Sequence, residues 1–272
     1  MFRNQYDSDV TVWSPQGRLH QVEYAVEAMK QGSATVGIKS ETHAVIVALK
    51  RAQNELCSHQ KKIYEIDTHS GVSIAGLLSD GRILARFLQT ECSSWRWDYK
   101  LPIPMKKLAE AMQLKLQANT QYYGRRPFGV GLLVAGYDKD GAHIIQTDPS
   151  AEVVSMLGTS IGSRSQSART YLERHVDEFE KSTPEQLIVH ALLALRDTLP
   201  AEENLSAQNT SIGIVGKDMP FKIIEDELVQ THLDQVATHP RNITAPGSGA
   251  APAAGRQSPA PGGAGAPEPM QQ

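Results

Sequence analysis

The chain has 272 residues, 27 of them basic and 30 acidic, and its formal net charge is −3 at pH 7. This balance argues against a basic nucleic-acid-binding protein and against an acidic disordered chain. Aromatic residues make up only 6% of the sequence, too few for a surface built to stack bases. We therefore expect a globular protein that binds no nucleic acid.

The sequence also lacks the marks of a membrane-bound, secreted or metal-binding protein. No apolar run approaches the ~20 residues that a membrane-spanning helix needs, and the first residues lack the apolar core of a secretory signal. The two cysteines, Cys57 and Cys92, fit neither a disulfide framework nor a zinc site. These features predict a soluble protein of a reducing compartment, with no cofactor, no metal and no membrane partner.

The first expected element is an amphipathic helix near the amino terminus. Its apolar residues recur at intervals of three and four, which places them on one helical face: Leu19, Val22, Val26 and Met29. Gly32 then ends the helix. A stripe this regular is too apolar to stay exposed on a monomer, so we expect the helix to pack against a neighbouring protein chain.

Short strands and longer helices follow in runs. The strands are expected in pairs around polar turns, at residues 34–39 and 44–49, 62–66 and 72–77, 128–137 and 142–146, and 211–215 and 221–224. The helices are expected at residues 79–88, 105–116, 163–175, 183–199 and 225–236. Because strands and helices come in runs rather than in strict alternation, we predict a layered α+β fold with antiparallel sheets covered by helices.

One of these helices has a well-marked start. Thr183 is suited to the N-cap position, Pro184 to the first helical position, and Gln186 follows the cap by three residues. This pattern is typical of a capping box, in which the two side chains bond the free backbone N–H groups of the first turn.

The carboxyl-terminal segment differs in composition from the rest of the chain. From Ala245 to Gln272 it consists mostly of Ala, Pro and Gly, with Arg256 and Glu268 as its only charges. Such a segment cannot bury enough apolar surface to offset the entropy of ordering it. We expect a folded domain over residues 1–239 and a disordered tail over residues 240–272.

Familiar catalytic motifs are missing from the sequence. It contains no nucleophile elbow, P-loop or dinucleotide fingerprint. Its nine histidines are scattered, and none pairs with another at the spacing of metal ligands. Composition and spacing alone therefore support a layered α+β protein and no particular function.

Several long segments resemble proteasome α-type subunits. Tyr6-Asp7, followed by residues 11–28 (TVWSPQGRLHQVEYAVEA) and 32–37 (GSATVG), is similar to the N-terminal signature of that family. The resemblance continues at residues 45–51, 76–77, 123–131 and 161–168 and covers nearly all of residues 1–239. The signature is too long and too varied in residue type to arise by chance.

The resemblance implies a fold and a set of partners. The expected fold is a four-layer α-β-β-α sandwich of the N-terminal-nucleophile hydrolase type, with an extra N-terminal helix, so that residues 1–32 form a gate segment and helix. The expected assembly is the 20S core particle of ubiquitin-dependent protein degradation, in the cytoplasm and nucleus. There the α-type subunits form a seven-membered outer ring on a catalytic β ring and meet regulatory-particle ATPases and other activators. The apolar stripe described above would then belong to a ring-assembly helix.

The resemblance also implies that this subunit is not an enzyme. Catalytic β-type relatives attack with an N-terminal threonine whose free amine is the base. The matching position here is Ser33, which follows a structural helix. The family's aspartate is replaced by Leu49, and Lys62 takes the lysine position. Two alternatives remain open: an active peptidase that uses Ser33 after processing, and a free-standing binding module.

Two groups of site residues follow from the resemblance. The family stabilises its open gate with a cluster that corresponds here to Tyr6, Asp7, Pro15 and Tyr24; the arginine that often comes next is replaced by Ser8. Activator tails bind the family between adjacent α subunits, in a pocket that corresponds here to Lys62, Gly76 and Leu77. Some relatives place an arginine near that pocket where this chain has Val26.

Overall fold

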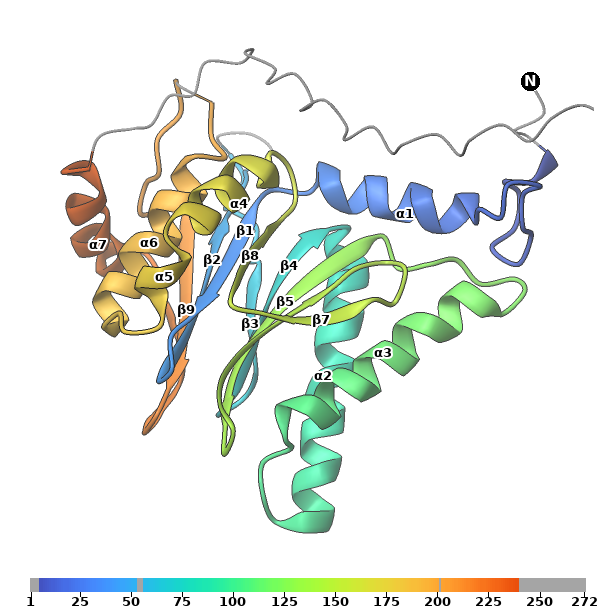
Figure 1. Cartoon of the computed structure of the whole chain (residues 1–272), viewed down its shortest axis with the longest axis horizontal. Helices are drawn as coiled ribbons and strands as arrows, with labels where there is room; N and C mark the ends of the chain where they lie inside the picture. Colours follow the sequence, from blue (N-terminus) through green and yellow to red (C-terminus); the bar gives the residue numbers. More distant parts are fainter. Residues whose placement is uncertain (1–4, 53–55, 201, 240–272) are drawn as a thin grey trace, which may run out of the picture. The chain divides into compact units, whose positions relative to one another are not determined.

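The computed structural model describes residues 5–52, 56–200 and 202–239. Within these ranges the chain forms two five-stranded sheets in which every pair of neighbouring strands is antiparallel. Figure 1 shows the two sheets between two groups of helices. The expected tail, residues 240–272, lies outside the described residues.

The first sheet has the strand order β10-β9-β2-β1-β8. Its strands are β1 (Thr35–Lys39), β2 (His43–Leu49), β8 (Gly158–Ile161), β9 (Thr210–Gly216) and β10 (Met219–Ile224). The second sheet has the order β3-β4-β5-β6-β7. Its strands are β3 (Ile63–Asp67), β4 (Ser70–Gly76), β5 (Val130–Asp138), β6 (Gly141–Thr147) and β7 (Val153–Met156).

Helices cover the outer face of each sheet. The helices on the second sheet are α2 (Leu78–Tyr99) and α3 (Met105–Gln121). The helices on the first sheet are α4 (Ser165–Arg174), α5 (Val176–Phe179), α6 (Pro184–Arg196) and α7 (Glu227–Ala237). The remaining helix, α1 (His20–Gln31), contacts β4 and β5. No helix among the described residues is long and apolar enough to cross a lipid bilayer.

Three apolar cores hold the four layers together. Strand β2 shows how, because successive side chains of a strand point to opposite faces. Val45 and Val47 belong to the core shared with α4–α7, whereas Ile46 belongs to the core between the two sheets. A third core lies between the second sheet and α2 and α3. The predicted α-β-β-α sandwich, with an additional N-terminal helix, is confirmed.

Most predicted elements are present with boundaries shifted by a few residues, but α2 continues to Tyr99, well beyond its expected end at residue 88. The capping box of α6 is confirmed, since Thr183 Oγ1 accepts from the Gln186 backbone N–H and the Gln186 side chain accepts from the Thr183 backbone N–H. The sequence analysis missed the four-residue elements β7, β8 and α5. These are too short to display a periodic apolar pattern.

Candidate functional site

The N-terminal segment, residues 5–19, lies against the first turns of α1. Tyr24 Oη donates a hydrogen bond to Asp7 Oδ2 at 3.2 Å, and Gln21 Nε2 donates to the main-chain oxygen of Asp7. Tyr24 itself is 41% exposed. The structure thus brings together Asp7 and Tyr24 of the four expected gate residues. Tyr6 precedes Asp7 directly, whereas Pro15 lies eight residues further along, in a separate turn.

That turn spans Ser14-Pro15-Gln16-Gly17. The Gly17 N–H donates to the Ser14 carbonyl at 2.9 Å, and Gly17 has a φ of +74°. Proline favours this geometry because its ring fixes φ at the second position of the turn. Arg18 then makes two hydrogen bonds of 2.7 and 2.6 Å to the Glu23 carboxylate. The turn is therefore tied to α1, and Pro15 acts through the shape of the turn.

The C-terminal half of α1 packs on the second sheet. Met29 is 7% exposed, and its side chain fills the space that a Cβ at Gly131 would need. Leu19, Val22 and Val26, the other members of the predicted stripe, are half-buried. Met29 therefore anchors α1 on the second sheet, whereas the other three residues of the stripe keep part of their apolar surface exposed.

Helix α1 meets β1 at a crowded junction. The Ser163 N–H donates to the Gly32 carbonyl at 2.7 Å, and a Cβ at Gly32 would lie much closer to the Gly76 backbone nitrogen than the contact distance of the two atoms allows. Gly76 has a φ of +118°, and the next residue, Leu77, donates its N–H to the Gly129 carbonyl at 2.9 Å. The predicted pocket residues Gly76 and Leu77 thus lie beside the junction. Sequence reasoning missed the contribution of Ser163.

Lys62 and Ser33 meet in the interior next to this junction. Lys62 Nζ donates to Ser33 O at 2.6 Å, to Ser33 Oγ at 2.7 Å and to Ala34 O at 3.3 Å. Ser33 Oγ in turn donates to the main-chain oxygen of Leu49 at 2.8 Å. Lys62 is only 2% exposed. The three positions that match a catalytic centre in β-type relatives are therefore close together.

This arrangement lacks a base for nucleophilic attack. A Ser33 nitrogen that stays bonded to Gly32 has its lone pair delocalised into the peptide group, and Leu49 offers a carbonyl in place of a carboxylate. Burial lowers the pKa of Lys62 to about 7, with a further contribution from the charge of Arg51. The amine nevertheless points its protons at three oxygen atoms, which is the arrangement of a donor rather than of a base.

Two family models match adjoining parts of the chain. The model for the N-terminal signature of the A-type proteasome subunits matches residues 6–28, and the model described as the proteasome subunit matches residues 29–215. The chain is an α-type member of the proteasome subunit family. It is thus a non-catalytic component of the outer ring of the 20S core. The alternative of a Ser33 peptidase was wrong.

Curated relatives of this α-type protein cover most or all of its length. It is 84% identical to the proteasome alpha type-1 subunit of Caenorhabditis elegans over 271 residues, 100% of both chains. It is 54% identical to the probable proteasome alpha type-6 subunit of Schizosaccharomyces pombe, covering 87% of each chain. It is 53% identical to the alpha type-1 subunit of Dictyostelium discoideum, covering 86% of this chain and 95% of that one. Residues 1–7 and 169–174 resemble the type-1 subunit in particular, in agreement with the relatives from C. elegans and D. discoideum.

Proposed function

We propose that this α-type subunit takes part in gating the substrate channel of the 20S core and in docking the activators that open it. The gate cluster would comprise Tyr6, Asp7, Pro15 and Tyr24. The observation that carries this proposal is the hydrogen bond between Tyr24 and Asp7, which joins the N-terminal segment to α1 at 3.2 Å. Because this hydrogen bond is exposed, the phenol or the carboxylate can exchange it for a bond to a group on a neighbouring chain at little cost in free energy.

The activator-tail pocket is proposed at Lys62, Gly76 and Leu77. A chain-terminal carboxylate needs a cation, and a charge-assisted hydrogen bond supplies strong discrimination for a chain end. Because the Lys62 amine already bonds main-chain oxygens of Ser33 and Ala34, an incoming carboxylate would take the place of one of them. The Leu77 side chain is 46% exposed and would contact apolar groups of the tail.

The proposed partners follow from the same family membership. We propose a seven-membered ring with other α subunits, stacked on a β ring, that receives regulatory-particle ATPases and other activators in the cytoplasm and nucleus. The exposed parts of Leu19, Val22 and Val26 would pack on a neighbouring α subunit, since half-buried apolar side chains in one row favour an interface. Met29 would hold the helix in position for this contact.

The test compares two adjacent lysines in assembled 20S cores. Lys62→Ala removes the buried amine, whereas Lys61→Ala removes an exposed amine that lies over the Tyr64 ring. Activator-stimulated peptide hydrolysis, at a sub-saturating activator concentration, should fall by roughly tenfold in Lys62→Ala, as expected for a lost charge-assisted contact. It should be unchanged in Lys61→Ala.

Native mass spectrometry of both variant cores provides the assembly control. If Lys62→Ala cores assemble fully and respond to the activator like wild-type cores, the proposed pocket is excluded. A monomer of about 30 kDa in cells would exclude the proposed seven-membered ring.

A further inference from the structure

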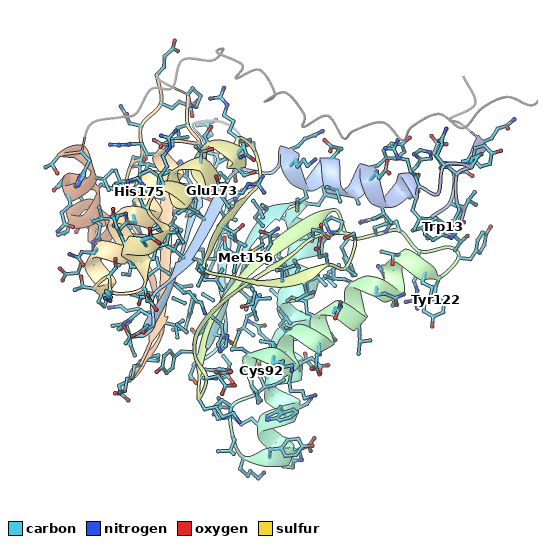
Figure 2. The ribbon with its side chains drawn as sticks, viewed as in Figure 1. Trp13, Cys92, Tyr122, Met156, Glu173 and His175 are labelled. Carbon is cyan, nitrogen blue, oxygen red and sulfur yellow. The ribbon has the colours of Figure 1, made fainter. Side chains whose placement is uncertain are left out.

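A surface cavity of about 870 Å³ opens in the helical layer that covers the first sheet. Its walls come from α4, α5, α6 and the end of α7, and Figure 2 shows His175 in this group of helices. Its volume lies within the roughly 300–1,000 Å³ that is typical of ligand pockets. Neither the gate segment nor the α1–β1 junction contributes to it.

Stacked rings form one wall of the cavity. The Tyr171 and His175 rings stack with centroids 4.2 Å apart, and His190 lies 5.9 Å from His175. The Phe179 ring meets His190 edge-on at 5.5 Å. Aromatic faces attract cations, and a planar guanidinium can stack on them.

The hydrogen bonds of two histidines determine which ring nitrogen is free to accept. His175 Nδ1 lies 2.8 Å from the Tyr171 main-chain oxygen, and His239 Nδ1 lies 3.2 Å from the Gln235 main-chain oxygen. A carbonyl oxygen only accepts hydrogen bonds, so both Nδ1 atoms carry the proton. The Nε2 atom of each neutral ring is therefore an acceptor.

The third histidine links a phenol to a carboxylate. His190 Nδ1 lies 3.1 Å from Tyr171 Oη, and His190 Nε2 lies 3.5 Å from Glu178 Oε2. Burial raises the pKa of Tyr171 to about 12 and lowers the pKa of His190. Near pH 7 the phenol thus donates to a neutral imidazole, whose other N–H faces Glu178. His190 then adds no positive charge to the cavity.

Carboxylates outnumber cations on the walls. Glu178, with 59% of its side chain exposed, and Glu185 both line the cavity, whereas Lys181 is its single Lys or Arg side chain. The cavity thus offers negative charge, ring faces and separate acceptor atoms. A guanidinium carries five N–H donors in one plane and suits acceptors that are spread apart, better than a compact ammonium does.

We infer that this cavity is a docking site for an arginine-bearing segment of a partner protein. The guanidinium would stack on the Tyr171–His175 wall and donate to Glu178 and to histidine Nε2 atoms. A segment is favoured over free arginine because the cavity is larger than one side chain fills and because Val189 and Leu193 add apolar wall beside the polar groups.

The test measures peptide binding to assembled 20S cores. The probe is a fluorescein-labelled peptide with two arginines between glycines, followed by fluorescence anisotropy. Glu178→Gln should weaken binding roughly tenfold, as expected for the loss of a charge-assisted hydrogen bond. His175→Phe keeps a stacking ring and removes the acceptor, and it should weaken binding several-fold. Glu152→Gln, an exposed site outside the cavity, is the matched control and should bind like wild type.

A change of peptide completes the test. A peptide with citrulline in place of arginine has a similar shape without the charge and should not bind. Equal binding of wild-type and Glu178→Gln cores, or of the arginine and citrulline peptides, would overturn the inference. Basal peptide hydrolysis by each core confirms that the variants assemble.

Discussion

The two ends of α1 are held in different ways. At the C-terminal end, Met29 is buried on the second sheet and Gly32 touches the backbone of Gly76 without space for a side chain. At the N-terminal end His20 is buried, but the contacts of α1 with the preceding segment are polar, among them the 3.2 Å bond from Tyr24 to Asp7. Figure 1 shows α1 extending from the sheets toward the N-terminal segment.

This difference indicates a fixed end and an adjustable end. Close packing resists displacement because any shift loses many contacts at once, whereas an exposed hydrogen bond contributes only about 1 kcal/mol and can be exchanged for another. A gate segment attached at the adjustable end could change partners while the body of the subunit stays unchanged. Four experiments test this comparison.

The largest effect on stability is expected when a methyl group is added at the C-terminal end of α1, and the same change near the N-terminal end is the comparison. Gly32→Ala forces a Cβ into the Gly76 backbone and should lower the free energy of unfolding by about 5 kcal/mol. Gly17→Ala adds the same group in open space, at a φ of +74°, and should cost only about 1 kcal/mol through backbone strain. Urea unfolding measures both. Equal losses in the free energy of unfolding would mean that the two ends of α1 are packed equally closely.

The second experiment follows stability as a function of pH at the junction. The pKa of Lys62 falls from 10.5 to about 7 on folding, so between these values the unfolded chain binds more protons than the folded chain. Stability should therefore rise with pH, by up to about 3 kcal/mol between roughly pH 7 and 9.5. The rise should be absent in Lys62→Met, with urea unfolding as the readout. Parallel pH profiles for the two proteins would contradict a buried, titrating amine.

The third experiment separates anchoring from assembly along the apolar stripe. Met29→Ala empties a packed site and should destabilise the fold by about 2–3 kcal/mol. Val22→Asp changes a half-buried position and should cost under about 1 kcal/mol, yet it should block incorporation into large complexes. Thermal unfolding and native mass spectrometry give the two readouts. Normal incorporation of Val22→Asp would show that this face is not an interface.

The smallest effect on stability is expected at the N-terminal end. Tyr24→Phe removes one exposed hydrogen bond and should change the free energy of unfolding by under about 1 kcal/mol. Activator-stimulated peptide hydrolysis should nevertheless fall several-fold if the bond belongs to the gate. Tyr123→Phe, at an 84% exposed tyrosine, should leave both quantities unchanged. A normal response of Tyr24→Phe cores would remove Tyr24 from the gate.

Local patterns predicted the elements that carry their own signals. In α3 the apolar residues Met105, Leu108, Met112 and Leu116 recur at intervals of three and four, and all are buried as that spacing indicates. Strand β8 gave no such signal because it buries polar residues. Thr159 Oγ1 donates to Gln146 at 2.6 Å, and Ser160 Oγ donates to the Thr35 carbonyl at 3.0 Å. These partners are distant in the sequence, so periodicity cannot reveal them.

The site residues could be named from the sequence only through the family resemblance. Tyr24 and Asp7 are separated by 17 positions, and no local rule joins them. Two of the three bonds from Lys62 end on main-chain oxygens of Ser33 and Ala34. Every residue type carries such an oxygen, so the sequence cannot show which oxygens accept from the Lys62 amine. Only the folded structure identifies them.

A single residue separates two strands that belong to different sheets. Strand β7 ends at Met156 in the second sheet, and β8 begins at Gly158 in the first, with the Leu157 carbonyl bonded to the Lys39 N–H at 2.9 Å. So short a crossover connects the two sheets covalently at this edge. Because one residue leaves no slack, any sliding of one sheet over the other would stretch the backbone at Leu157, and a force that acts on one sheet is passed to the other.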